Sequence, residues 1–121
     1  MTRIFDLLKG YCPEIEMRMR PQLDSAIRGS IVRGQLPQVW HFITEQETAS
    51  FTVDRNGNAK AQEGNVGSPD VIVEWNHECL LSVLRSRTLE GIPPGEGPKV
   101  TTHTMRGRIG YSMIRKYLRF P

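Results

Sequence analysis

Residues 68–84 read SPDVIVEWNHECLLSVL, and the spacing of the apolar residues changes in the middle of this stretch. Residues 71–75 have the pattern of a strand, whereas Leu80, Leu81 and Leu84 share one face of a helix. Asn76 lies between the two halves and is a good N-cap, because its side-chain oxygen can accept hydrogen bonds from the first helical turn. The stretch therefore predicts a strand-to-helix joint that places three leucines over a sheet.

A polar cluster of His77, Glu78 and Cys79 follows at the start of this helix. Side chains two positions apart on a helix point about 200° apart, so His77 and Cys79 cannot bind one metal ion from within it. Glu78 is explained by the helix dipole, which favours an acidic residue in the first turn. The sequence contains no CxxC, HExxH or GxSxG motif, and we predict no metal site, no catalytic residue and no cofactor.

Cys79 nevertheless leaves one alternative open. Its apolar neighbours favour a buried, inert thiol. An exposed thiol near a helix N-terminus would have a lowered pKa and could act as a nucleophile. A small thiol enzyme, or an enzyme-accessory domain that uses Cys79, is therefore an alternative function.

His41 and His103 lie in predicted strands and could meet across the sheet, but a partly buried structural role is favoured for both.

Upstream, three antiparallel strands in a meander are predicted. Apolar and polar residues alternate in QVWHFITEQ and in TASFTVDRNG, and the polar residues EQET connect the two strands. Asn56-Gly57 is a strong two-residue hairpin turn, since both positions tolerate positive φ. It leads into the polar strand NAKAQEG.

The first third of the chain is predicted to be helical. One helix ends at Gly10, a second begins at Pro13, and Pro21 kinks the second or splits it in two. At the other end, KVTTHTMRG has the composition of a fifth strand and RIGYSMIRKYLRF that of a closing helix. The loop at 88–98, rich in proline and glycine, cannot be regular structure and is a candidate lid.

This order predicts an α+β fold with a single five-stranded, largely antiparallel sheet, helices packed on one face and a candidate apolar cavity between them. The 121 residues suit one domain, with helices over 2–35 and the sheet and its helices over 37–120. Composition is that of an ordinary globular protein, at 38% apolar and 24% charged residues. Two cysteines, no predicted signal peptide and no membrane-spanning window favour a cytoplasmic location.

The net charge of +3 is unevenly distributed, because every charged residue from Lys99 onward is basic. A solvated helix face would explain this, and so would contact with an anionic headgroup or membrane surface. The candidate contacts are Arg108, Arg115, Lys116 and Arg119. A nucleic-acid-binding domain that uses this basic helix is a further alternative, although nucleic acid is not the favoured partner.

Aliphatic, aromatic and flexible residues dominate the segments that would face one another. Their simplest role is a packed core, but they could also line a cavity in which methionines adapt to ligands of variable shape. The candidate lining residues are Trp40, Phe42, Phe51, Leu80, Leu81, Leu84, Met105, Ile109, Met113, Ile114 and Tyr117.

Three segments, taken in order, resemble the sterol carrier protein type-two domain. These are VWHFITEQETASFTVDRNGNAKAQEG, which is similar to the opening meander of that family, PDVIVEWNHECLLSVLRS, which is similar to its strand–helix unit, and GRIGYSMIRKYLRF, which is similar to its closing helix. The resemblance covers roughly residues 13–120. The family usually has a short helical segment before the last strand, where this chain has GIPPGEGPK.

The resemblance implies a five-stranded sheet flanked by helices that enclose a tunnel for fatty acyl chains, sterols or similar apolar molecules, without a metal or a catalytic residue. We therefore expect a carrier module, not an enzyme, that captures and releases an apolar lipid-like molecule and transiently contacts an anionic membrane surface. The sequence does not indicate which lipid is bound or the oligomeric state.

Overall fold

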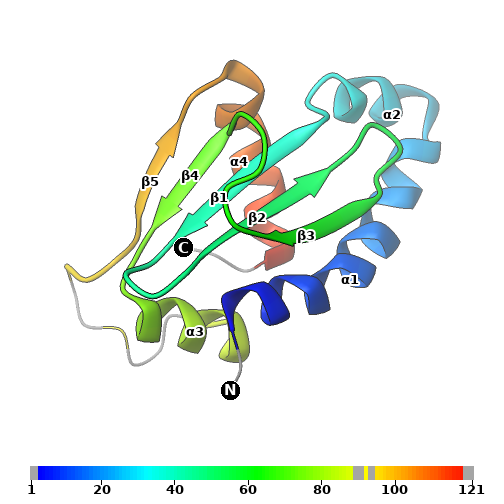
Figure 1. Cartoon of the computed structure of the whole chain (residues 1–121). Coiled ribbons are helices and arrows are strands. Elements are labelled where there is room, and N and C mark those ends of the chain that lie inside the picture. Colours follow the sequence, from blue (N-terminus) through cyan, green and yellow to red (C-terminus); the bar gives the residue numbers. More distant parts are fainter. Residues whose placement is uncertain (1–2, 89–91, 93–94, 119–121) are drawn as a thin grey trace.

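The structure is a computed structural model, and it describes residues 3–88, 92 and 95–118; at 113, 114 and 116–118 only the backbone is described. Figure 1 shows a sheet with helices behind it and at its ends. In chain order the elements are α1 (Ile4–Asp24), α2 (Ala26–Arg33), β1 (Gln38–Ile43), β2 (Thr48–Val53), β3 (Ala59–Glu63), β4 (Val71–Glu74), α3 (His77–Ser86), β5 (Lys99–Thr102) and α4 (Met105–Leu118).

The strands form one five-stranded sheet in the order β3-β2-β1-β4-β5. The meander is antiparallel, β4 pairs with β5 in the same way, and only β1 and β4 are parallel. This confirms the predicted α+β class and the largely antiparallel sheet. The parallel pair arises because the chain crosses from β3 at one edge, past two strands, to reach β4.

The core lies between one face of the sheet and the helices. Residues at alternate positions point to this inner face, so Trp40 lies opposite Phe51 on one side and Val71 on the other. The joint at Asn76 forms as predicted, since the Cys79 N–H donates to Asn76 Oδ1 at 3.2 Å. Helix α3 thereby turns Leu80, Leu81 and Leu84 into the core.

Helix α1 differs from the prediction, because it runs without a break through Gly10, Pro13 and Pro21. The helix ends instead at Ser25, whose extended backbone lets its side chain accept from the Arg28 N–H and so begin α2. A buried stripe along α1 includes Leu8, Ile15, Met19 and Leu23. Burial of this stripe outweighs the local cost of two prolines, which remove only two backbone donors.

Helix α1 also covers one edge of the sheet. Strand β3 is the edge strand, and the Ala59 N–H on its outer side donates to Glu16 Oε1 at 2.9 Å. Cys12, one turn before Glu16, lies in the same interface, where burial raises the pKa of its thiol to about 11. A covered edge cannot pair with another chain, so α1 protects this side of the sheet.

The hairpin turn after Val53 is longer than predicted. Gly57 has a positive φ of 81°, but Asn56 does not, so the loop is not a two-residue turn with both central positions left-handed. Asp54 organises it, because its carboxylate accepts from the N–H groups of Asn56 and Asn58. An Asp side chain that bonds ahead along its own backbone favours this wider loop.

Two carboxylates in the turn between β1 and β2 accept hydrogen bonds from the first turns of α1 and α3. Glu47 accepts from the Ile4 N–H at 2.6 Å and the Phe5 N–H at 3.4 Å, at the start of α1. Glu45 accepts from the His77 N–H at the start of α3. Carboxylates at helix N-termini satisfy free donors and complement the helix dipole, so this short polar loop sets the position of both helices.

Replacing Glu47 by alanine is expected to lower the free energy of unfolding by about 1–2 kcal/mol, because two helical N–H groups lose their acceptor in a half-buried place. Urea denaturation followed by circular dichroism measures this. Gln46→Ala in the same exposed turn is the control and should change stability by less than about 0.5 kcal/mol. Equal effects of the two substitutions would contradict the capping role of Glu47.

The end of the chain also departs from the prediction. Strand β5 stops at Thr102, and α4 begins at Met105 instead of Arg108. Thr104 causes the early start, since its hydroxyl accepts from the Gly107 N–H at 2.9 Å, as an N-cap does. The added turn brings Gly107 into the helix and changes which residues of α4 face the sheet.

The outer face of the sheet carries one loop. His41 Nε2 lies 3.1 Å from Val66 O, and Ser50 Oγ accepts from the Val66 N–H at 2.7 Å. The loop after β3 therefore packs across His41 and Ser50. His103 is exposed beyond β5, and β4 separates that strand from β1, so the two histidines do not meet.

Candidate functional site

The candidate site is the apolar cluster between the sheet and helices α1, α3 and α4. Trp40, Phe42 and Phe51 come from β1 and β2, and the leucines come from α3. The rings of Trp40 and Phe42 stack with centroids 6.3 Å apart, and Tyr111 of α4 stacks on Trp40 at 5.6 Å. The structure thus brings together six of the predicted lining residues, Trp40, Phe42, Phe51, Leu80, Leu81 and Leu84.

This cluster is packed in the present conformation. Trp40, Phe42, Phe51 and Leu80 are each at most 1% exposed, whereas a side chain beside an empty ligand-sized cavity would expose area to a water-sized sphere. These residues contact one another and the helices. A ligand can reach them only if an element of the core moves.

Two of the predicted lining residues are on the wrong side of α4. Met105 is 68% exposed and Ile109 is 49% exposed, so neither faces the core. The reason is that α4 docks on the sheet through Gly107 and Gly110, which are buried and lie on the opposite side of the helix. Met113, Ile114 and Tyr117 lie in α4, but their side chains are outside the described part of the structure.

A buried polar anchor holds the first turns of α4 to the sheet. Gln38 is fully buried, and its amide donates to Gln35 O and to Arg106 O, each at 2.6 Å. Its carbonyl accepts from the indole N–H of Trp40 at 3.1 Å. Gln38 therefore links α4 to the aromatic ring at the centre of the cluster.

Asp70 is the second part of this anchor, and it is also fully buried. One carboxylate oxygen accepts from the Val39 N–H at 2.8 Å. The other accepts from the Thr104 hydroxyl at 2.7 Å and from Arg106 Nε at 2.8 Å. A buried carboxylate with three donors is well satisfied, so Asp70 joins β1, β4 and the start of α4 in one network.

Two glycines allow α4 to approach this anchor closely. A Cβ atom at Gly107 would lie 2.3 Å from Asp70 O, and one at Gly110 would lie 2.2 Å from Gln38 Nε2. No other residue type fits at this distance without displacing the backbone or the hydrogen-bonded amide. The glycines and the polar anchor together fix the first two turns of α4 on the sheet.

Five residues of this anchor carry no signal in the sequence strong enough to predict a site: Gln38, Thr104, Arg106, Gly107 and Gly110. Two signals were available: a polar residue at an inward position of an otherwise apolar strand, and a Thr three residues before a Gly at a helix start. The partner of each residue depends on a contact between segments far apart in the chain, and a single sequence does not reveal such contacts.

His77 and Cys79 are separated as predicted. His77 is buried, with Nδ1 2.9 Å from the Thr44 hydroxyl and Nε2 4.0 Å from Glu47. Cys79 is half-buried and lines a separate hollow of about 420 Å³ with Trp75, Glu96 and Lys99. The expectation of a buried Cys79 is therefore only partly met, because Cys79 lies on a side of the first turn of α3 that borders this hollow.

Cys79 is expected to react with iodoacetamide well before Cys12. Burial raises the pKa of the Cys12 thiol to about 11 from its ordinary value of 9.0, so its thiolate population near pH 8 falls about 100-fold. Mass spectrometry of tryptic peptides after timed alkylation measures both rates. Cys79→Ser should leave almost no fast alkylation, and rapid labelling of Cys12 in that variant would contradict the packing of α1 on β3.

The predicted cationic contacts are only partly described. Arg108 and Arg115 are exposed on α4, and the guanidinium of Arg115 lies 5.6 Å from the ring centroid of Tyr111. The side chain of Lys116 and the whole of Arg119 lie outside the described part. Residues 89–91, 93 and 94 of the predicted lid at 88–98 also lie outside it, and in the described remainder Glu96 O accepts from the Trp75 indole at 2.6 Å.

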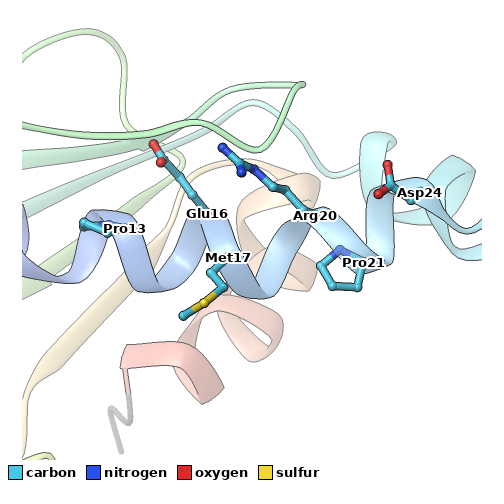
Figure 2. Close-up of a pocket in the computed structure, with 6 residues that line it drawn as sticks. All are labelled: Pro13, Glu16, Met17, Arg20, Pro21 and Asp24. Carbon is cyan, nitrogen blue, oxygen red and sulfur yellow. The ribbon is translucent and has the colours of Figure 1, made fainter.

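An open hollow of about 500 Å³ lies elsewhere, along the surface of α1. It is lined by Pro13, Glu16, Met17, Arg20, Pro21 and Asp24, all from that helix. Figure 2 shows Glu16 and Arg20 on the side toward the strands, with Met17 pointing away from them. This hollow is shallow and includes none of the predicted lining residues.

Neither a metal-binding cluster nor a membrane-spanning helix is found among the described residues. Within residues 3–88, 92 and 95–118 there is no group of three or more His, Cys, Asp or Glu side chains that could hold a metal ion. Over the same residues, no helix has the length and apolar character that crossing a membrane requires.

The arrangement of helices and strands in this chain is similar to that of solved structures. A ubiquinone synthesis protein described as UbiJ-SCP2 superposes with a TM-score of 0.54 at 11% identity, over 92% of this chain and 95% of the other. Sterol Carrier Protein 2 Like 2 from Aedes aegypti gives 0.47 at 16% identity, over 89% and 95%. The chain has the sterol carrier protein type-two fold. The resemblance noted in the sequence is thereby confirmed at the level of the fold.

A conserved hypothetical protein from Thermus thermophilus, described as a candidate sterol carrier protein, gives a TM-score of 0.48 at 14% identity, over 93% of this chain and 81% of the other. No family model matches the sequence, and no curated protein matches it. The type-two fold of this chain is therefore recognised through its shape and not through sequence similarity.

Proposed function

We propose that this chain is a carrier domain that binds an apolar lipid-like molecule, such as a fatty acyl chain, a sterol-like molecule or an isoprenoid, and performs no chemistry on it. The observation that carries the proposal is the aromatic and aliphatic cluster between the sheet and the helices, with Tyr111 of α4 stacked on Trp40, in a chain with the type-two fold. The neighbour described as UbiJ-SCP2 is named for ubiquinone synthesis, which agrees with an isoprenoid among the candidate ligands.

The ligand reaches the cluster by displacing the Tyr111 ring from Trp40. The first turns of α4 are held by Asp70 and Gln38, whereas the half-buried Tyr111 ring, which follows them, stacks on Trp40. An aromatic pair contributes about 0.5–1.5 kcal/mol. Each buried methylene of a ligand contributes about 0.8 kcal/mol, so a few methylenes offset the lost stack.

The exposed cations on α4 would then meet the polar end of the ligand or an anionic membrane surface. Arg108 and Arg115 are the described candidates, and Lys116 and Arg119 are proposed on sequence alone. Each cation near an anionic surface contributes about 1 kcal/mol, and salt weakens this attraction. Capture would therefore be faster at low ionic strength, and release from the anionic surface slower.

The test uses a Trp75→Phe variant, in which Trp40 is the single tryptophan. Titration with a C16 fatty acid should change Trp40 emission at micromolar concentrations, and solvent extraction of the purified protein should yield lipid detectable by mass spectrometry. Tyr111→Ala should tighten binding about threefold to tenfold, since the competing stack is removed. Ile109→Ala, on the outer side of the same helix, is the control and should leave the affinity unchanged.

Absence of co-purified lipid together with absence of any response to the fatty acid or to a C20 isoprenoid alcohol would overturn the proposal. A response that Tyr111→Ala and Ile109→Ala alter equally would place the ligand elsewhere than beneath α4. In either case the thiol and nucleic-acid alternatives remain to be tested by Cys79 reactivity and by the salt dependence of binding to DNA.

A further inference from the structure

The two edges of the sheet differ. Helix α1 covers β3, and Glu16 satisfies a backbone donor there. Strand β5 forms the other edge, and Figure 1 shows no other described element beyond it. An uncovered edge strand presents a row of N–H and C=O groups that can pair with another extended chain.

The register between β4 and β5 shows which backbone N–H and C=O groups of β5 point away from the sheet. The His103 N–H donates to Asp70 O at 2.8 Å, and Thr101 lies opposite Ile72. Successive residues of an antiparallel strand direct their backbone groups to opposite sides, so Val100 and Thr102 direct theirs away from β4. Among the described residues, none donates to or accepts from these outward groups.

The surface at the end of β5 combines polar, apolar and basic side chains. A hollow of about 220 Å³ is lined by Thr102, His103, Thr104, Met105 and Arg108. Met105 supplies an exposed apolar surface, and Ile109 continues it one turn further along α4. Arg108 is exposed and supplies positive charge at this end of β5, whereas Lys99 at the other end lies opposite Glu74. This favours a partner with apolar and acidic side chains.

We propose that β5 is a docking strand for an extended, acidic segment of a partner protein, which adds a sixth strand to the sheet. The backbone groups of Val100 and Thr102 supply the pairing, Met105 receives an apolar side chain, and Arg108 receives a carboxylate. A second copy of this chain is a poorer occupant, because twofold pairing of β5 would bring the basic residues of both copies together.

The proposal is tested with a pool of fluorescent octapeptides that carry Glu or Asp at alternate positions and Val, Ile, Thr or Leu between them. Members of the pool should bind the full chain in anisotropy measurements, and a matched pool with Lys in place of the acidic residues should bind at least about tenfold more weakly. Amide resonances of Val100 and Thr102 should shift on binding.

Two variants locate the site. Thr102→Pro removes an outward N–H while the bonds to β4 remain, and it should weaken binding at least about tenfold. Arg108→Glu should weaken it about fivefold and remove the preference for acidic peptides. Arg28→Glu, on α2, is the control and should have no effect. Circular dichroism checks that each variant is folded, and Arg108→Glu carries the test if Thr102→Pro is not.

Failure of every acidic peptide to bind would overturn the proposal. So would binding that survives Arg108→Glu with shifts confined to other strands, or a dimer in sedimentation that Thr102→Pro dissociates, which would make a second copy the occupant. None of these outcomes affects the lipid proposal, whose readout is Trp40 emission.

Discussion

Replacement of Gly107 by alanine is expected to lower the free energy of unfolding by about 3 kcal/mol, which is a large part of the stability of a domain of this size. The new Cβ would lie 2.3 Å from Asp70 O and 2.8 Å from the Asp70 carbonyl carbon. A backbone carbonyl cannot rotate away as the end of a long side chain can. Helix α4 must therefore shift outward and weaken its contacts with the sheet.

Gly10→Ala is the matched control for this experiment. Gly10 is also within a helix, but a Cβ there meets nothing within 4 Å. Alanine is a better helix former than glycine, so this change should raise stability by about 0.5–1 kcal/mol. Urea denaturation of both variants, with hydrogen exchange to follow α4 separately, measures the contrast. Equal stabilities of Gly107→Ala and the unchanged chain would contradict the close docking of α4.

Replacement of Asp70 by alanine is expected to lower the free energy of unfolding by about 3–4 kcal/mol. The substitution removes the acceptor for the Val39 N–H, the Thr104 hydroxyl and Arg106 Nε in one step. The Val39 donor belongs to the central strand, where burial leaves little room for water to replace the carboxylate. The start of α4 should also loosen, because Thr104 and Arg106 lose their common partner.

Asp54→Ala is the control for Asp70→Ala, because it removes a carboxylate that accepts similar hydrogen bonds at an exposed position. Asp54 also accepts from two backbone N–H groups, those of Asn56 and Asn58, but it lies in an exposed turn where water can replace it. Its loss should cost about 1 kcal/mol. Denaturation curves for the two variants should therefore differ by about 2 kcal/mol or more, and a smaller difference would contradict the role of the buried anchor.

Local rules determined much of this fold. The change of period across residues 68–84 and the capping side chain of Asn76 specify the β4–α3 joint, since both act within a few residues. Alternation of apolar and polar residues likewise specifies β1 and β2, whereas the register that pairs Trp40 with Phe51 comes from the structure. These features are encoded at short range, and the order of elements already indicated the type-two fold.

Tertiary contacts decided what the local rules left open. Gly10, Pro13 and Pro21 are helix breakers by local rules, yet α1 continues because its buried stripe outweighs their cost. The direction of Met105 and Ile109 follows from the docking of Gly107 and Gly110 against residues about 40 and 70 positions away.

The sequence by itself thus determined the class of fold, the strand–helix joint and the apolar faces of β1, β2 and α3, because hydrophobic periodicity and capping are local properties. The tertiary structure decided how the cluster is closed. Gln38, Asp70 and two glycines meet only after the sheet has formed, and they fix the start of α4 above Trp40. Complementary positions of this kind depend on distances between remote segments, which no local pattern contains.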